Sequence, residues 1–245
     1  MTAKTCVVTG SSSGIGRAIA ERFGEKGHNV VINYRTSEEA AEKTAANVEE
    51  AGGSALVVQA DVTDIDSVRR MGDRVRKEFG MVDVLVNNAG INQDVKFTEM
   101  SHEEWDTVLD VHLDGAFHAT QTFYDDLAAA DEGRLINISS IIGKEGNFGQ
   151  ANYATAKSGM FGFTRTLALE LAPEGSTANC VTPGFIRTRM VDELPEHVKD
   201  QIREDTPLGR LGTPEEIAEV VAFLASDRSS FITGEVIDAN GGKDL

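Results

Sequence analysis

Tyr153 and Lys157 stand four residues apart in the stretch NFGQANYATAK (147–157). At this spacing two side chains lie on one face of a helix, so the phenol and the ammonium can share a site. A free phenol has a pKa of about 10, and we expect the nearby cation to lower it toward neutrality. A serine hydroxyl in NISS (137–140) could hydrogen-bond a substrate oxygen. These groups suit hydride transfer to a carbonyl, although such Tyr–Lys pairs are also common on helices without any catalytic role.

A glycine-rich turn, TGSSSGIG (9–16), follows the first apolar stretch and opens a helical pattern. Its glycines let the backbone approach a pyrophosphate, and the helix start offers free N–H groups and a positive dipole end. The spacing differs from the usual dinucleotide fingerprint, so the turn alone does not settle the ligand. The predicted cofactor-binding residues of this turn are Gly10, Ser12, Ser13, Gly14, Ile15 and Gly16.

The second predicted strand ends in VVINYR, without a carboxylate, and Arg35 follows directly. Dinucleotide folds place an acidic residue here for a ribose 2′-hydroxyl or a basic one for a 2′-phosphate. We therefore predict a preference for NADPH; the alternative is a solvated arginine in a turn. Asp61 and Val62, after the third strand, could bracket an adenine.

The positions of these motifs require alternating strands and helices. We predict strands at 5–9, 28–34, 55–58, 82–90, 134–140, 176–184 and 235–242, and helices at 17–26, 37–51, 67–79, 103–129, 153–172 and 214–225. Valine- and isoleucine-rich strands between helices favour a doubly wound parallel sheet covered on both faces, the Rossmann-type α/β class. We expect one domain over 1–245, with the irregular stretch 187–213 as a substrate lid.

Composition excludes several classes of partner. Forty acidic residues against 23 basic ones give a net charge of −17, which repels nucleic acid and anionic membranes. There is no long apolar segment and no basic start of a signal peptide, so we expect a cytoplasmic protein. The scattered histidines make a metal site improbable, and both cysteines fit a buried core. The acidity suits either an ordinary soluble protein or adaptation to high salt.

In this order, the motifs resemble the short-chain dehydrogenase/reductase family over essentially the whole chain: TGSSSGIG, Asp61-Val62, NNAG (87–90), NISS, YATAK (153–157) and PGFIRT (183–188). The resemblance implies that Ser140, Tyr153 and Lys157 are catalytic. It also implies that Tyr153 and Lys157 contact the coenzyme, with Lys157 holding the nicotinamide ribose. Further coenzyme contacts are implied for Asn88, Ala89, Gly90, Pro183, Gly184, Ile186 and Thr188, together with a homotetramer formed through the helices at 103–129 and 153–172.

One position departs from the family pattern. Relatives usually carry an asparagine where this chain has His112, and that asparagine helps to hold a water that links the catalytic lysine to solvent. His112 is therefore a further catalytic candidate that could relay protons. The alternatives are that only its backbone carbonyl matters, or that the side chain merely fits.

Within the family, the stretches 91–100, 146–153 and 207–218 resemble acetoacetyl-CoA reductases and bacterial 3-oxoacyl-carrier-protein reductases. Asp94, Phe148, Gln150 and Phe185 would line the pocket for a short 3-oxoacyl group. We expect NADPH-dependent reduction of acetoacetyl-CoA, with the carrier-protein thioester as the alternative substrate. A non-catalytic nucleotide-binding protein is a remote alternative, because such a protein would be expected to lose Tyr153 or Lys157.

Overall fold

The computed structural model describes residues 3–192 and 194–243. Within these residues, seven strands form one parallel sheet in the order β3-β2-β1-β4-β5-β6-β7. The strands are β1 (Thr5–Val8), β2 (Asn29–Tyr34), β3 (Ser54–Gln59), β4 (Val84–Asn87), β5 (Arg134–Ile138), β6 (Thr177–Pro183) and β7 (Val236–Ala239). The order reverses between β1 and β4, which creates a crevice at their carboxyl ends. The predicted fold class is confirmed.

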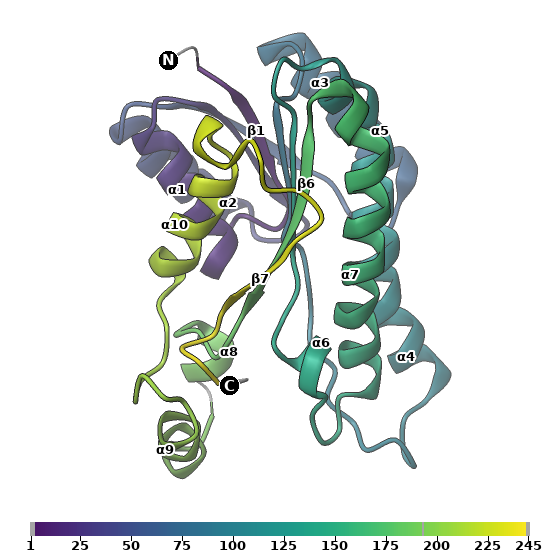
Figure 1. Ribbon diagram of the computed structural model, residues 1–245, viewed down its shortest axis with the longest axis vertical. Coiled ribbons are helices and arrows are strands. Elements are labelled where there is room, and N and C mark those ends of the chain that lie inside the picture. The colour runs from purple at the N-terminus through teal and green to yellow at the C-terminus, as the bar shows by residue number, and fades with distance from the viewer. Residues whose placement is uncertain (1–2, 193, 244–245) are drawn as a thin grey trace.

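Helices cover both faces of the sheet (Figure 1). One layer holds α1 (Gly14–Glu25), α2 (Glu38–Glu50) and α10 (Pro214–Leu224), and the other holds α3 (Ile65–Phe79), α5 (Gly115–Ala129) and α7 (Ala151–Leu171). Shorter segments are α4 (His102–Leu109), α6 (Ile142–Glu145) and the 3-10 turns η2 (Ala172–Glu174) and η3 (Asp227–Ser229). Two layers on one sheet explain why most strands are apolar throughout.

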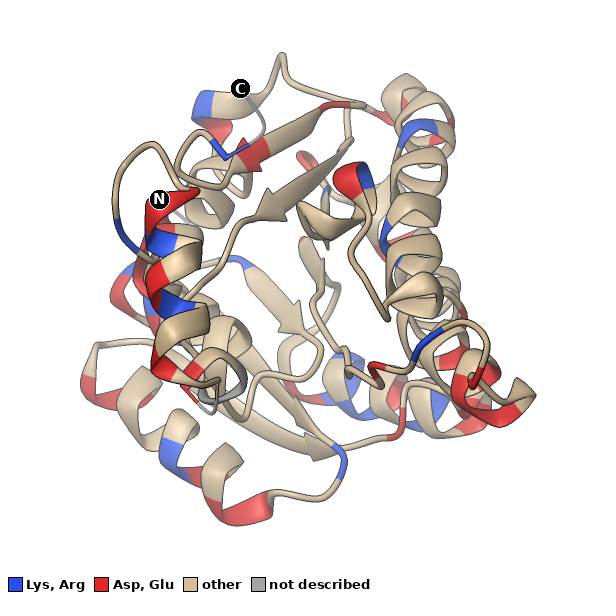
Figure 2. Cartoon of the chain, turned by 90° about the horizontal axis from the view of Figure 1, so that it is seen from below, with Lys and Arg blue, Asp and Glu red and all other residues tan. Residues whose placement is uncertain are grey.

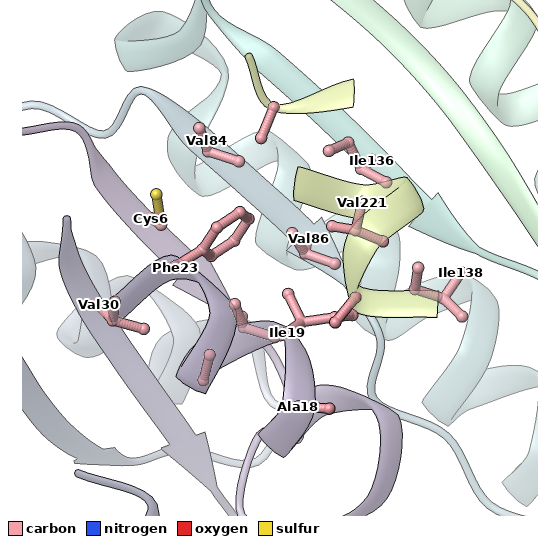
Figure 3. Packing of buried hydrophobic residues seen from close by; sticks show 14 of the residues in the cluster. Cys6, Ala18, Ile19, Phe23, Val30, Val84, Val86, Ile136, Ile138 and Val221 are labelled. Carbon is pink, nitrogen blue, oxygen red and sulfur yellow. The ribbon is translucent and has the colours of Figure 1, made fainter. Parts of the chain in front are cut away.

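The core has two halves because successive strand residues point to opposite faces. Cys6 and Val8 of β1 belong to the cluster under α1 and α10, whereas Val7 belongs to the cluster under α3, α5 and α7. Figure 3 shows Phe23 and Ile19 of α1 packed with strand residues such as Val86 in the first cluster. Both cysteines are free and buried, as expected.

The helix predicted at 103–129 is one helical run, but it is not a regular α-helix. A π-helical turn, η1 (Asp110–Asp114), separates α4 from α5. A capping box starts the run at Ser101, whose side chain and that of Glu104 bond reciprocally to the backbone. The prediction of one long helix is therefore confirmed, but it did not include the π-helical turn η1. Such turns often mark functional positions.

The stretch 187–213, predicted to be irregular, contains α8 (Arg189–Asp192) and α9 (Glu196–Glu204). Its base is closed by a parallel bridge between Ile186 and Gly212. Val191, Ile202 and Leu211 form a small apolar cluster of its own, against which Phe185 packs. The segment thus contains two short helices, an apolar cluster of its own and a bridged base.

The helices of the described chain offer no candidate for a membrane span, since none combines the necessary length with the necessary hydropathy.

Candidate active site

Tyr153 and Lys157 lie on the first two turns of α7, and the structure brings them together as predicted. The Lys157 ammonium is 5.6 Å from the centroid of the Tyr153 ring. Lys157 is 5% exposed, and its Nζ donates a 2.8 Å hydrogen bond to the carbonyl oxygen of Ile138, the last residue of β5. The ammonium is therefore held at the carboxyl end of the sheet beside the phenol.

The two serines of NISS have separate tasks. Ser139 donates from its hydroxyl to the backbone carbonyl of Lys157 at 2.7 Å, which fixes α7 against the end of β5. The Ser140 oxygen accepts a 3.1 Å hydrogen bond from the Ile142 N–H. Ser140 also hydrogen-bonds the Tyr153 phenol, an interaction that acts to lower the pKa of the phenol. The Ser139 hydroxyl is thus committed to the backbone, whereas the Ser140 hydroxyl faces the phenol, where a substrate oxygen is predicted to bind.

The start of α7 is fastened by side chains that the sequence analysis missed or assigned to substrate. Asn152 is fully buried, and its amide donates to the carbonyls of Gln93 (3.1 Å) and Glu104 (3.0 Å). Its side-chain oxygen accepts from the Tyr153 N–H at 2.8 Å. An asparagine next to the tyrosine on a buried helix face was the available signal for this positioning role.

A buried amide network lies beneath the site. The Asn87 amide donates to Asn137 at 2.8 Å and to the Thr120 hydroxyl at 2.9 Å, and the Asn137 amide donates to the Thr164 hydroxyl at 2.8 Å. These bonds tie β4 and β5 to α5 and α7. Asparagines inside the apolar strands VLVN and RLINI were the signal, because buried amides must find partners.

The prediction that the pKa of the phenol falls is wrong in this structure. The pKa of Tyr153 is raised, first by burial and further by the charge of Asp94, against the opposing hydrogen bond from Ser140. Burial disfavours the charged phenolate more than its surroundings favour it. At neutral pH the phenol is therefore protonated, which is the form that can donate a proton.

The pKa of Lys157 is lowered from 10.5 to about 8, because burial disfavours its charge. At pH 7 the ammonium form still prevails. A cation beside the phenol then stabilises the phenolate that forms when Tyr153 gives up its proton, so its effect grows as the reaction proceeds.

His112 lies in η1, is 3% exposed, and meets the Tyr153 ring edge-on, with the ring centroids 5.2 Å apart. Burial, and then the charge of Lys157, lower its pKa to about 3. The imidazole is neutral at any working pH. A β-carbon at Gly90 would lie 2.3 Å from its Cε1, so the side chain fits only because residue 90 is glycine.

The glycine-rich turn has the shape that a pyrophosphate requires. Gly10 and Gly14 have φ values of +64° and +57°, which favour glycine, and a β-carbon at Gly10 would lie 2.9 Å from Ala89 Cα. The amide of Asn88 donates to the carbonyls of Thr9 (2.9 Å) and Gly10 (3.2 Å). Ser13, the N-cap of α1, makes no side-chain capping bond, so the helix start remains open to an anion. The turn therefore fits a dinucleotide.

Just beyond the carboxyl ends of β2 and β3, Arg35 and Asp61 are surface residues. The Arg35 Nη1 atom lies 3.9 Å from Asp61 Oδ2, and the side chains are 57% and 37% exposed. Val62 is buried, with Gly115 packed closely against its side chain. Arg35 is thus a loosely paired cation that can reorient.

The segment PGFIRT closes over the same crevice. A β-carbon at Gly14 would lie 3.7 Å from the Thr188 methyl, so Thr188 reaches the glycine-rich turn, and Ile186 is buried at the base of segment 187–213. Gly184 packs instead against Asn240. A cavity of about 410 Å³ on that side, lined by Gly184, Leu208 and α10, contains none of Ser140, Tyr153 and Lys157. The candidate active site is therefore defined by the positions of Ser140, Tyr153 and Lys157, and it does not lie in this cavity.

The four substrate-pocket candidates are in different surroundings. Gln150 donates to the Asp94 carboxylate at 2.8 Å, which joins the 91–100 loop to the start of α7. Phe148 is 82% exposed. Phe185 packs against the apolar cluster of Val191, Ile202 and Leu211, and Lys243 Nζ lies 5.6 Å from its ring centroid.

Proteins of known function that are similar in sequence to this chain include reductases. The family model described as enoyl-(acyl carrier protein) reductase matches residues 10–244. The 3-oxoacyl-[acyl-carrier-protein] reductase FabG of Staphylococcus aureus is 44% identical over 239 residues, covering 98% of this chain and 97% of its own. FabG of Aquifex aeolicus is 44% identical over 98% of this chain and 96% of its own. The acetoacetyl-CoA reductase of Cupriavidus necator is 43% identical over 99% of this chain and 98% of its own.

The chain belongs to the short-chain dehydrogenase/reductase family. It is an oxidoreductase that acts on a ketone or the corresponding CH–OH group.

Proposed function

We propose that this protein reduces a short 3-oxoacyl thioester with NADPH, most simply acetoacetyl-CoA to 3-hydroxybutyryl-CoA. The observation that carries the proposal is the position of the Tyr153 phenol, which is hydrogen-bonded to Ser140 and whose ring centroid lies 5.6 Å from the buried Lys157 ammonium. Relatives named for both 3-oxoacyl-carrier-protein and acetoacetyl-CoA reduction support the substrate class. Oxidation of NADPH on addition of acetoacetyl-CoA tests it; no turnover would favour a non-catalytic nucleotide-binding protein.

In this reaction the chain's own groups manage the proton and the orientation of the ketone. Bound NADPH supplies the hydride, and the glycine-rich turn, Arg35 and the 183–188 segment would hold it. The Ser140 hydroxyl donates to the 3-oxo oxygen and aligns it with the phenol. Tyr153 protonates that oxygen as negative charge develops on it, and Lys157 stabilises the resulting phenolate. The lid excludes water from the site.

The preference for NADPH rests on Arg35, which is 57% exposed and paired with Asp61 at 3.9 Å. A 2′-phosphate offers this guanidinium a closer and more highly charged partner. We expect Arg35→Ala to raise the KM for NADPH about tenfold or more and to leave that for NADH nearly unchanged. Arg69→Ala, at an exposed arginine of α3, is the matched control. Equal effects on both coenzymes would contradict the assignment.

CoA is proposed over an acyl-carrier protein because an acidic carrier needs an extended basic surface. In Figure 2, many of the acidic segments lie on the outer helices. Of the arginines within segment 187–213, Arg210 is paired with Glu216 at 2.6 Å, Arg187 is exposed, and the side chain of Arg189 lies outside the described residues. Comparing kcat/KM for the two thioesters at low and high KCl tests the choice; a carrier thioester preferred at both salts would reverse it.

A homotetramer is proposed for the assembly. Phe117 of α5 and Leu169 of α7 are 47% and 78% exposed on the two helices that the family resemblance assigns to contacts between copies. Light scattering after gel filtration should give four chains, and Leu169→Glu should lower that number. A monomeric wild-type protein would reject the proposal.

We also propose that the net charge of −17 is an adaptation to high salt. Screening by salt removes the repulsion among surface carboxylates. Stability against urea should rise with KCl concentration, and a maximum near zero salt would contradict this.

A further inference from the structure

A histidine of α5 is bonded to the backbone that follows strand β3. His118 is half-buried in the first turn of α5, and its Nδ1 atom is 2.9 Å from the Val62 carbonyl oxygen. A carbonyl oxygen can only accept, so Nδ1 carries the hydrogen and donates it. This bond joins α5 to a segment that lies 56 residues earlier in the chain.

A second residue of the same helical turn meets the side chain of Val62. A β-carbon at Gly115 would lie 2.7 Å from the Val62 Cγ2 atom, so α5 can approach this closely only because residue 115 is glycine. Gly115 and His118 are three residues apart and share one face of the helix. Val62 itself is 6% exposed. One face of α5 therefore fixes both the side chain and the carbonyl of Val62.

The turn at 61–63 is also braced by bonds within its own part of the chain. Asp61 Oδ1 accepts hydrogen bonds from the Thr63 N–H at 3.0 Å and from the Thr63 hydroxyl at 2.8 Å. The Asp61 N–H donates to the Ser67 hydroxyl at 3.3 Å. These local bonds shape the turn, whereas the contacts from α5 determine where the turn lies relative to the distant part of the chain.

We propose that His118 positions the 61–63 turn for the adenine of the coenzyme, so that a residue of α5 controls how tightly the adenosine half is held. Asp61 and Val62 are the residues expected to bracket an adenine, and no sequence motif pointed to His118. The consequence for NADPH rests on the proposed function; the hydrogen bond from Nδ1 does not. His118 acts through Val62 and is therefore a positioning residue.

The effect should appear in binding because a ring is held best by a backbone that is already in place. A turn that is fixed beforehand loses less freedom when the ligand arrives, and less of the binding free energy is spent on ordering it. Without the His118 donor, the Val62 carbonyl loses its partner and the turn is less restrained. The candidate catalytic groups are held by bonds between β5 and α7, so they should keep their places.

Adenosine 2′,5′-bisphosphate, the adenosine part of NADPH without its nicotinamide, tests the proposal without any turnover. In isothermal titration, His118→Leu should raise its Kd about fivefold, because the donor is gone. His118→Asn keeps an N–H near the place of Nδ1 and should stay within about twofold of the wild type. His102→Leu, at an exposed histidine that begins α4, is the matched control and should not change the Kd.

Two binding outcomes would overturn the proposal. A His118→Leu protein that binds the bisphosphate as tightly as the wild type, while its urea midpoint falls, would give His118 a purely structural role. A wild-type protein that does not bind the bisphosphate at all would remove the adenine site itself.

Steady-state kinetics with acetoacetyl-CoA separate the two halves of the coenzyme. His118→Leu should raise the KM for NADPH about fivefold. The KM for reduced nicotinamide mononucleotide, which lacks the adenosine half, should not change. The effect belongs to KM and not to kcat. An equal rise in KM for both coenzymes would mean that the substitution loosens the whole crevice, which contradicts the proposal.

Nitrogen NMR on the wild-type protein labelled with ¹⁵N-histidine tests the hydrogen bond directly, and His118→Asn identifies the signal. At pH 9, where imidazole rings are ordinarily neutral, the hydrogen should reside on Nδ1. A hydrogen on Nε2 would overturn the assignment of His118 as the donor. Failure of the proposed function is a separate result: a wild-type protein without acetoacetyl-CoA turnover would reject that function, and the bisphosphate titration would still decide the role of His118.

Discussion

Strand β5 has a buried cation at each end, and the two cations are treated differently. Arg134, at its start, is 1% exposed, and its Nη2 lies 3.3 Å from a carboxylate oxygen of Glu132. Lys157, at its end, is 5% exposed, and its ammonium donates a hydrogen bond to the neutral carbonyl of Ile138. The charge of Arg134 is therefore compensated by a nearby carboxylate, whereas the charge of Lys157 is not.

The difference indicates a structural role for the amino end of β5 and a chemical role for its carboxyl end. Burial lowers the pKa of Arg134, but the charges of Glu132 and Asp227 oppose that effect, and Lys4 joins both carboxylates to the N-terminal segment. This end fastens the chain. At the other end the charge of Lys157 is left without such compensation, and its pKa falls to about 8. A buried charge without a carboxylate lowers stability and is available to a phenolate or a ligand.

The largest effect is expected at the catalytic end from Tyr153→Phe. Without the phenol, no proton donor faces the ketone, and kcat should fall about 10³-fold. The affinity for NADPH should stay within a few-fold of the wild type, because the coenzyme crevice is unchanged. Stopped-flow absorbance and fluorescence titration measure the two quantities. Loss of coenzyme binding to the same degree would mean that the tyrosine is structural.

Lys157→Met should lower kcat about 10²-fold and yet stabilise the protein at pH 7. The folded pKa of about 8 lies below the ordinary 10.5, so the folded state binds fewer protons between these values and wild-type stability rises with pH across that window. Below pH 8 the buried Lys157 charge lowers the free energy of unfolding by its full amount, about 3 kcal/mol. Loss of the bond to Ile138 offsets about 1 kcal/mol of the gain.

Urea unfolding at pH 7 and at pH 10 measures this gain for Lys157→Met, with Lys26→Met at an exposed position as the control. The gain should shrink toward pH 10. A variant that is less stable than the wild type at pH 7 would show that Lys157 is well compensated after all.

At the amino end, Glu132→Gln should destabilise the protein by about 1 kcal/mol or less without changing kcat. The Glu132 side chain is 37% exposed, so solvent screens much of its attraction to Arg134. Urea midpoints and steady-state rates on the same preparation test both parts. A changed kcat would mean that the two ends of β5 are coupled.

The smallest effect is expected from Asp227, whose pKa is lowered, first by the hydrogen bond that it accepts from the Glu132 carboxyl when that group is protonated, and then by Lys4. A carboxyl with a lowered folded pKa contributes stability above its ordinary pKa of 3.8 and loses that contribution as pH falls through the folded value. Its side chain is 63% exposed, so the contribution is about 0.5 kcal/mol or less. Asp227→Asn should lose it at pH 7, and the difference from wild type should vanish near pH 2.

Much of this arrangement could be predicted from the sequence. The alternating strands and helices predicted the sheet. The spacing of Tyr153 and Lys157, with Ser140 at a strand end, predicted that these three side chains come together, and we propose that they are catalytic. The π-turn at 110–114 was not predictable, because its apolar pattern matches that of an ordinary helix. The sign of the pKa change at Tyr153 was also missed, since it depends on how deeply tertiary packing buries the phenol. The role of Asn152 was missed as well, because its side chain hydrogen-bonds the backbone of Gln93 and Glu104, and the spacing of residues in the sequence does not reveal such distant contacts.

The central claim is that the site works with a protonated phenol beside a charged, buried ammonium. Single-turnover hydride transfer from NADPH to acetoacetyl-CoA, measured from pH 6 to 10, tests it most directly. The rate should be level near neutrality and fall above about pH 8, as Lys157 loses its proton. A rate that rises through pH 8 to 10 would contradict the account, because phenolate would then be the working form.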